Sequence, residues 1–358
     1  MTGTSPMPET PMPTFPAGFQ WGVSTSAYQI EGAALDDGRS PSVWDTFAHT
    51  PGRISDASTG DVACDHYHRM PADVALLADL GVSAYRFSIA WPRIVPTGSG
   101  QVNPAGVAFY DRLVDELLAL GVDQLATLYH WDLPQPLQDA GGWSNRATAE
   151  RFAEYADVMG RAIGDRVKQW ITLNEPVVVT ELGHLKGIHA PGTNVWPELF
   201  AVVHHQLLGH GLATAALRAS SAAPVSLANS YCTAWAVGAD GTRASATDAD
   251  RVAAAAYDAV HNRLYTDPLL LGRYPDEASA LTAGKLDDTV LDGDLAIIST
   301  PLDALGVNYY NPVGVGVADA TAVLPYSERE ITGYPRTAFD WPVIPDGLRE
   351  TLVLLREQ

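Results

Sequence analysis

Short apolar runs alternate with longer amphipathic segments along this chain. From residue 19 onward, each apolar run leads into a connection rich in Gly, Pro or Asn and then into an amphipathic stretch. Such alternation indicates βα units and a parallel sheet. The apolar runs predict six strands, over Phe19–Val23, Ala84–Ile89, Gln124–Tyr129, Gln169–Leu173, Val225–Asn229 and Ala304–Asn308.

Capping residues mark the boundaries of the intervening helices. Asn before Pro, as in Asn103-Pro104, is favourable at the first helical turn, and a proline at Pro71 fits the start of another helix. Gly81 and Gly121 are each followed by Val and a strand, as short connections from a helix to a strand require. The predicted helices are Ala72–Leu80, Ala105–Leu120, Arg146–Ile163 (opened by Asn145) and Gly347–Arg356.

A parallel sheet of this size is either an open doubly wound sheet or part of a barrel. The open sheet expects a Gly-rich phosphate loop after the first strand, and Trp21–Ser26 has no such pattern. Polar or aromatic residues recur near the strand ends instead, which is typical of a barrel whose chemistry lies at one rim. These residues are Gln29, Arg86, His130, Trp131, Asn174, Glu175, Asn308 and Tyr310. The prediction is an α/β fold of the (β/α)8 TIM-barrel type.

The segment KQWITLNEP places a glutamate directly after a buried strand. The apolar run from Lys168 ends at Asn174 and Glu175, and Pro176 stops it. In parallel barrels the carboxyl ends of the strands carry the chemistry. Glu175 is therefore the leading catalytic candidate.

Composition narrows the class of protein. The net charge of −20 arises from 42 acidic and 22 basic residues without a basic run, which disfavours nucleic acid as a partner. Cys64 and Cys232 are expected to be buried free thiols, and no apolar stretch is long enough for a membrane span. Residues 1–14 are expected to be a flexible, Pro-rich segment and residues 15–358 a single partial barrel domain. A cytoplasmic location is the expectation.

The histidine-rich segments predict no metal site, and no cofactor is expected. Asp65, His66 and His68 lie close together in sequence, as do the histidines near His204 and His210. Neither group has four ligands at the spacing of a metal site, so structural roles are expected.

Several motifs, in order, resemble the family 1 glycoside hydrolases, which include the β-glucosidases. They are FPAGFQWGVSTSAYQIEGA (15–33), YRFSIAWPRI (85–94), LYHWDLPQPL (128–137), ITLNEP (171–176), HAPG (189–192) and LGVNYYNP (305–312). The resemblance covers nearly the whole chain. It implies a (β/α)8 barrel that hydrolyses β-glycosides with retention, through a glycosyl-enzyme intermediate.

The resemblance also implies roles for individual residues. Glu175 corresponds to the general acid/base, and Asn174 to the residue that hydrogen-bonds the sugar 2-hydroxyl. Arg86 and Tyr310 correspond to the pair that orients the nucleophilic carboxylate, with Asn308 beside them. Gln29, His130 and Trp131 correspond to residues that hold the 3- and 4-hydroxyls of the sugar. The implied substrate is a β-glucoside or a short β-linked oligosaccharide.

The chain departs from the family pattern after its last predicted helix. Family members continue into a seventh strand that carries the nucleophilic glutamate and an eighth strand followed by a sugar-binding loop, so only about six of the eight βα units are expected here. The first and sixth strands then become open edges. Val177 stands where many relatives have Trp, which implies a different leaving-group subsite.

Three hypotheses remain open from the sequence. The favoured one is the larger part of a β-glucosidase that a C-terminal segment complements, with self-association as a further expectation. The second is a catalytically silent sugar-binding or scaffold protein of the same fold. The third is an enzyme with a different nucleophile, such as Asp340 or Glu328, neither of which follows a predicted strand.

Overall fold

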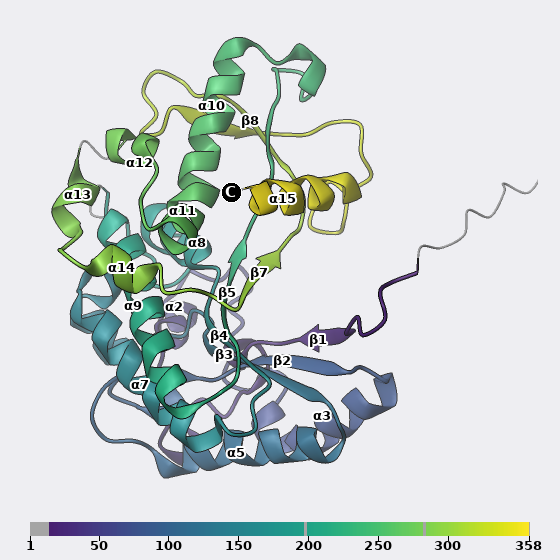
Figure 1. Ribbon diagram of the computed structural model, residues 1–358, viewed down its shortest axis with the longest axis vertical. Helices are drawn as coiled ribbons and strands as arrows, with labels where there is room; N and C mark the ends of the chain where they lie inside the picture. The colour runs from purple at the N-terminus through teal and green to yellow at the C-terminus, as the bar shows by residue number, and fades with distance from the viewer. Residues whose placement is uncertain (1–13, 197–198, 282–283, 358) are drawn as a thin grey trace, which may run out of the picture.

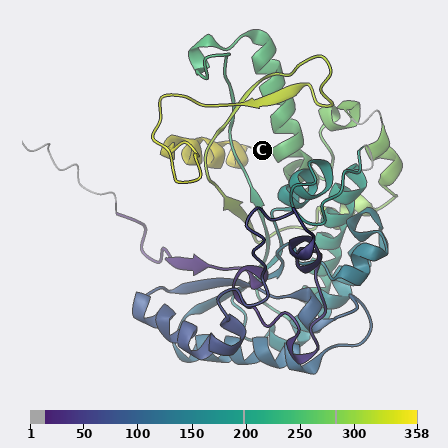
Figure 2. The same ribbon diagram turned by 180° about the vertical axis from the view of Figure 1, so that it is seen from behind.

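A six-stranded parallel sheet forms the centre of the chain in the computed structural model, which describes residues 14–196, 199–281 and 284–357. The strand order, β1-β2-β3-β4-β5-β7, follows the sequence, as in the first units of a (β/α)8 barrel. Figures 1 and 2 show that the sheet curls without closing. Its strands are β1 (Gly22–Ser24), β2 (Ala84–Ser88), β3 (Asp123–Tyr129), β4 (Gln169–Asn174), β5 (Val225–Ser230) and β7 (Ala304–Asn308).

Helices cover the outer face of this sheet, and the longest of them connect successive strands (Figure 1). Helix α3 (His66–Leu80) precedes β2. The strands from β2 to β5 are connected in turn by α5 (Pro104–Ala119), α7 (Ala147–Ile163) and α9 (Leu199–Ser220). Later helices are α10 (Asp248–Asp258), α11 (Leu264–Leu271), α12 (Asp276–Leu281), α13 (Lys285–Thr289), α14 (Asp294–Ile298) and α15 (Pro345–Glu357). Short ones are α1 (Ala27–Ile30), α2 (Val43–His49), α4 (Trp91–Ile94), α6 (Gln135–Asp139) and α8 (Pro176–Val178).

Large aromatic side chains fill the layer between helices and sheet. Trp91 stacks on Tyr155 of α7 with ring centroids 5.1 Å apart, and Phe152 of the same helix packs on Trp143. All four are fully buried. This packing holds α7 against the sheet and so fixes the positions of the strand ends.

A second, three-stranded sheet lies beyond the carboxyl ends of β5 and β7, and the sequence did not predict it. It consists of β6 (Ala234–Ala236), β8 (Val313–Val317) and β9 (Tyr326–Arg329), in the order β6-β8-β9. β8 pairs parallel with β6 and antiparallel with β9. These strands have three to five residues each, too few for the apolar period to separate them from loops.

Most predicted boundaries are confirmed. The second to sixth strands match within a residue. The Asn103 side chain accepts a hydrogen bond from the backbone N–H of Ala105 and caps α5. Gly81 and Gly121 both have a φ of 70° after a helix, a conformation that favours glycine.

Three predictions are wrong. The first strand is Gly22–Ser24 and not Phe19–Val23, because Phe19 and Trp21 pack on Phe15 before the pairing with β2 begins. Pro71 lies inside α3, which begins at His66, so the proline removes one intrahelical hydrogen bond without ending the helix. Cys64 is exposed, whereas Cys232 is buried as predicted, and both are free.

The edges of the sheet are open, as predicted. β1 and β7 are the outermost strands, and Phe15, Phe19 and Trp21 near β1 are about half exposed. The expected flexible segment 1–14 lies, except for residue 14, outside the described residues. Among the residues described, no helix has both the length and the apolar character needed to cross a bilayer.

Candidate active site

Three strands of the curled sheet that are not adjacent in its order place their polar side chains together. Asn174 is the last residue of β4, Asn308 is the last residue of β7, and Arg86 lies within β2. The strands are parallel, so their carboxyl ends meet at one edge. The Arg86 guanidinium reaches across the inside of the sheet: Nη1 donates to Asn308 Oδ1 (3.3 Å), and Nη2 donates to Asn174 Oδ1.

Glu175 occupies a conformation that bulky residues rarely adopt. Its φ of 47° and ψ of 61° lie in the left-handed region, and Pro176 begins α8 directly after it. Its backbone N–H donates to the carbonyl of Ala228 in β5 at 2.8 Å. Strained backbone of this kind is held by its surroundings and is frequent at active sites. Here it directs a carboxyl group that is 3% exposed toward the inner side of the strand ends.

Two donors hold the Glu175 carboxyl group. Asn308 Nδ2 donates to Oε1 at 2.7 Å, and the Tyr310 hydroxyl donates to the same oxygen at 3.3 Å. Burial raises the pKa of Glu175 above its ordinary value, while these hydrogen bonds and the positive charge of Arg86 oppose the rise. The carboxyl group thus combines a raised proton affinity with partners for its ionised form.

Asn174 connects the other polar groups of the site. Its Oδ1 accepts hydrogen bonds from Arg86 and from Asn308 Nδ2, the latter at 3.0 Å. With Oδ1 held in this way, Nδ2 points to His130 Nε2 at 3.2 Å. The amide orientation is therefore determined by its partners.

His130 offers an unpaired donor at the end of β3. Burial lowers its pKa to about 3, with a further contribution from Arg86, so the ring is neutral at ordinary pH. Since Nε2 accepts from Asn174, the proton is on Nδ1, and this buried atom has no hydrogen-bond partner among the described residues. An unpaired buried N–H is costly, and an oxygen of a ligand would satisfy it.

Trp131 directly follows His130 and, like Glu175, has a left-handed backbone conformation, with a φ of 78°. Its Nε1 donates to the Asn174 carbonyl at 2.8 Å, and its ring lies 4.9 Å from that of His130 and 6.2 Å from that of His189. The indole thus forms an apolar wall beside polar groups. Sugars, with polar hydroxyls and apolar C–H faces, suit such a combination.

Gln29 and Tyr310 lie at the exposed border of this cluster. Gln29 is on α1, just after β1, and its side chain is exposed. No side-chain hydrogen bond joins it to the other predicted residues within the described ranges. Tyr310 is 54% exposed, and its ring packs on Trp341 at 5.1 Å. The structure therefore brings together seven of the eight predicted residues, and Gln29 lies on the short helix that follows β1.

Three further residues belong to the site and were missed in the sequence. Thr127 of β3 accepts from Arg86 Nε at 3.2 Å, and Trp341 supports Tyr310. His261 forms an ion pair with Glu181 at 3.1 Å, and its positive charge lowers the pKa of Glu175. In the sequence, Thr127 could have been noticed only as a polar residue inside the apolar run that forms β3. Trp341 and His261 come from segments that only tertiary structure brings near.

The other candidate groups make structural contacts. His204 Nε2 lies 2.8 Å from the Asp294 carboxylate, and His210 Nδ1 lies 2.6 Å from the Thr172 hydroxyl. No cluster of three metal-ligating side chains occurs in the part of the chain that is described. Glu328, on β9, forms an ion pair with Lys186. Asp340 lies in an exposed turn beside Arg336.

Comparisons with known proteins agree with this arrangement. Residues 12–358 match the model of glycosyl hydrolase family 1. The chain is 49% identical to thermostable beta-glucosidase B of Thermobispora bispora over 344 residues, which are 96% of this chain and 70% of the relative. It is similar to the family 1 beta-glucosidase structure from Thermotoga maritima, with a TM-score of 0.89, 40% identity and coverage of 96% of this chain and 75% of that one.

A second similar structure contains a bound ligand. It is the complex of virulence factor SghA with its substrate analog salicin, at a TM-score of 0.91 and 40% identity, covering 96% of this chain and 74% of that one. The fold and the strand-end carboxylate therefore define a barrel glycosidase. The chain belongs to glycosyl hydrolase family 1. Its relatives are β-glucosidases, and the partial (β/α)8 fold predicted from the sequence is confirmed.

Proposed function

We propose that Glu175 is the general acid/base of a retaining hydrolysis of terminal β-D-glucosyl residues. In the first step a nucleophilic carboxylate forms a bond to the anomeric carbon, and the protonated Glu175 carboxyl group donates its proton to the glycosidic oxygen as that oxygen leaves. In the second step the Glu175 carboxylate removes a proton from water, and the water oxygen attacks the anomeric carbon as its bond to the nucleophilic carboxylate breaks. The observation that carries the proposal is Glu175 itself, buried at the strand end with a raised pKa.

The groups around Glu175 suit the sugar that this reaction requires. Asn174, with its amide orientation set by Arg86 and His130, is proposed to hydrogen-bond the 2-hydroxyl, a contact that strengthens in the oxocarbenium-like transition state. His130 Nδ1 is proposed to donate to a ring hydroxyl, with Gln29 on the other side and Trp131 against the apolar face. Asn308 is proposed to contact the bound substrate as well.

The nucleophile is proposed to be a carboxylate from sequence outside these 358 residues. Asn308 and Tyr310 donate to Glu175, and the positive charge of the Arg86 guanidinium acts on the same place, which would favour a second carboxylate there. A second carboxylate would share them. In retaining enzymes the two carboxyl groups lie roughly 5 Å apart, which the reach of these donors allows.

The substrate is proposed to be a β-glucoside or a short β-linked oligosaccharide, and the location cytoplasmic. Salicin, bound in the structure of SghA, is an aryl β-glucoside and a reasonable probe. Val177, at the start of the segment after Glu175, is fully buried and leaves that side of the site without an aromatic group from this position.

An azide experiment tests the proposal on the chain as it is. An activated aryl β-glucoside is incubated with the purified chain, with and without sodium azide. Azide takes the place of the second carboxylate: it forms a C–N bond to the anomeric carbon as the aryl oxygen leaves, so α-glucosyl azide and phenol are expected.

The controls separate the alternatives. Glu175→Ala should retain glucose binding and lose the azide product with poor leaving groups. Rapid turnover without azide would mean that another residue of the chain is the nucleophile, and Asp340→Asn and Glu328→Gln then identify it. A chain that binds glucose and forms no azide adduct would instead be a sugar-binding protein without catalysis.

A further inference from the structure

A second cavity lies away from the sugar site, between helix α2 and the segments around residues 35 and 62. Its volume is about 480 Å³, within the range of small-molecule sites. Leu35 and Val62 contribute an apolar wall, and four aspartates and two histidines are among the other lining residues. The aspartates are Asp36, Asp45, Asp61 and Asp65, and no lysine or arginine is among the lining residues.

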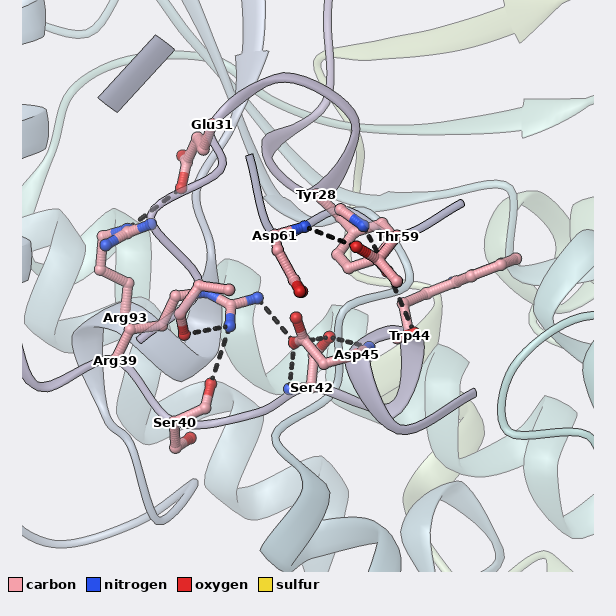
Figure 3. A network of polar contacts seen from close by, with 12 residues as sticks. Tyr28, Glu31, Arg39, Ser40, Ser42, Trp44, Asp45, Thr59, Asp61 and Arg93 are labelled. Carbon is pink, nitrogen blue, oxygen red and sulfur yellow. Dashed lines mark hydrogen bonds and ion pairs between the residues drawn. The ribbon is translucent and has the colours of Figure 1, made fainter. Parts of the chain in front are cut away.

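Asp45 has one satisfied and one unsatisfied carboxylate oxygen. The residue is 6% exposed. Its Oδ2 accepts from Arg39 Nη2 at 2.8 Å and from the backbone N–H and hydroxyl of Ser42 at 2.6 and 2.7 Å (Figure 3). Its Oδ1 is buried without a partner. Buried acceptors in native proteins are nearly always hydrogen-bonded, so a donor is missing at this point.

The neighbouring side chains do not supply that donor. Figure 3 shows the Asp61 carboxyl group directed at Asp45 from the opposite side, and Asp45 Oδ1 has no hydrogen-bond partner among the described residues. His49 Nδ1 lies 2.7 Å from the Asp45 backbone carbonyl, and its Nε2 lies 3.2 Å from Asp61 Oδ2. Both ring nitrogens of His49 thus face acceptors other than Asp45 Oδ1.

His68 is engaged in the same way. Its Nδ1 lies 2.6 Å from Asp65 and its Nε2 lies 3.4 Å from Asp36. Even with both histidines protonated, the negative charges of the lining residues outnumber the positive ones. The wall is therefore complementary to a cation that can donate hydrogen bonds.

We propose that this cavity binds a small alkylammonium ion. Its N–H groups donate to Asp45 Oδ1 and to Asp61, and its alkyl chain lies against Leu35 and Val62. An organic cation fits better than a metal ion, since one wall is apolar and the described residues contain no cluster of three metal-ligating side chains. This site is independent of the hydrolysis proposed above.

Titration calorimetry of the 358-residue chain with 1,4-diaminobutane tests the proposal, and 1,4-butanediol is the neutral control of the same length. The diamine is expected to bind and the diol is not. Asp61→Asn should weaken diamine binding by about tenfold or more, because a charged hydrogen-bond acceptor is lost. Its side chain is 45% exposed, so the variant should fold.

Two control variants make the result decisive. Asp248→Asn removes the same charge from a side chain that is 99% exposed on α10, and it should leave diamine binding unchanged. Leu35→Ala should weaken the diamine more than methylammonium. The proposal is overturned if the wild-type chain does not bind the diamine, if the diol binds equally well, or if Asp248→Asn weakens binding as much as Asp61→Asn.

Discussion

Glu175 and Asp132 are two buried carboxyl groups with different surroundings. Both have raised pKa values, mainly because of burial. Asn308 and Tyr310 donate hydrogen bonds to Glu175, whereas neither oxygen of Asp132 has a hydrogen-bond partner among the described residues. Donors that favour the ionised form allow Glu175 to release its proton within one reaction cycle. Asp132 lacks them and, with its pKa raised to about 8, is suited to a structural role as a neutral group below that pH.

Glu175→Gln should slow the hydrolysis by a factor that depends on the leaving group of the substrate. Gln keeps the shape and cannot donate the acid proton, so kcat/KM for alkyl β-glucosides should fall by about two to four orders of magnitude. Dinitrophenyl glucoside, whose leaving group needs no protonation, should lose much less in its first step. Steady-state kinetics measure both losses in the chain combined with a segment that supplies the second carboxylate. Glu328→Gln, a surface change on β9, is the control, and equal losses for both leaving groups would contradict the assigned role.

Tyr310→Phe should raise the pKa of Glu175 further. The variant removes a hydrogen bond that favours the carboxylate, so the protonated form gains. NMR titration of the chain with ¹³C-labelled glutamate side chains measures this pKa directly, and Glu175→Gln assigns the resonance. A wild-type Glu175 that titrates below ordinary glutamates would contradict the burial argument.

Asp132→Asn should stabilise the fold increasingly as the pH rises from about 4 to 8. Burial raises the pKa of Asp132 from 3.8 to about 8, so the folded chain retains a proton that the unfolded chain has released. The stability contributed by that proton is complete below the unfolded pKa and is lost as the pH rises through the folded pKa. Asn resembles the protonated form at every pH. Urea unfolding of both proteins at several pH values measures the difference, and a pH-independent difference would refute the prediction.

The elements of the main sheet were predictable because each strand carries a local signal. Apolar runs such as Gln169–Leu173 end at Pro, Gly or Asn, and the helices between them begin with caps such as Asn103. The late start of the first strand and the small second sheet were not predictable, because they depend on packing and on strands of a few residues. The same holds for the site: Glu175 follows a strong local pattern, whereas His261 reaches it only through the fold.

A buried ion pair connects the residue that ends α1 to α4 and α5. Glu31 accepts from Arg93 Nε at 3.1 Å, as Figure 3 shows, and also from the Tyr110 hydroxyl. All three side chains are buried. Arg93→Met should destabilise the fold by about 3–5 kcal/mol, because it leaves a buried carboxylate without its cation. The Glu31→Leu/Arg93→Met double variant should recover part of that loss in urea unfolding. A double variant less stable than Arg93→Met alone would contradict this account.

At the scale of the whole molecule, the open edges of the sheet are expected to govern assembly. β1 and β7 present unpaired backbone groups, and the aromatic residues Phe15, Phe19 and Trp21 beside β1 are about half exposed. Exposed strand edges and apolar patches favour association. We therefore expect either self-association or the binding of a segment that supplies the remaining strands.

Complementation should restore turnover and bury Trp21 at the same time. A separate segment with the seventh and eighth βα units of a family relative would pair with both open edges, exclude water from Trp21 and supply the second carboxylate. Turnover of an aryl β-glucoside should then appear together with a blue shift of the tryptophan fluorescence, and Trp21→Phe should lose much of that shift while keeping the activity. A segment in which the nucleophilic glutamate is replaced by Gln should give the same spectral change without turnover. Sedimentation velocity over a range of concentrations distinguishes this from self-association, which would bury Trp21 without any added segment.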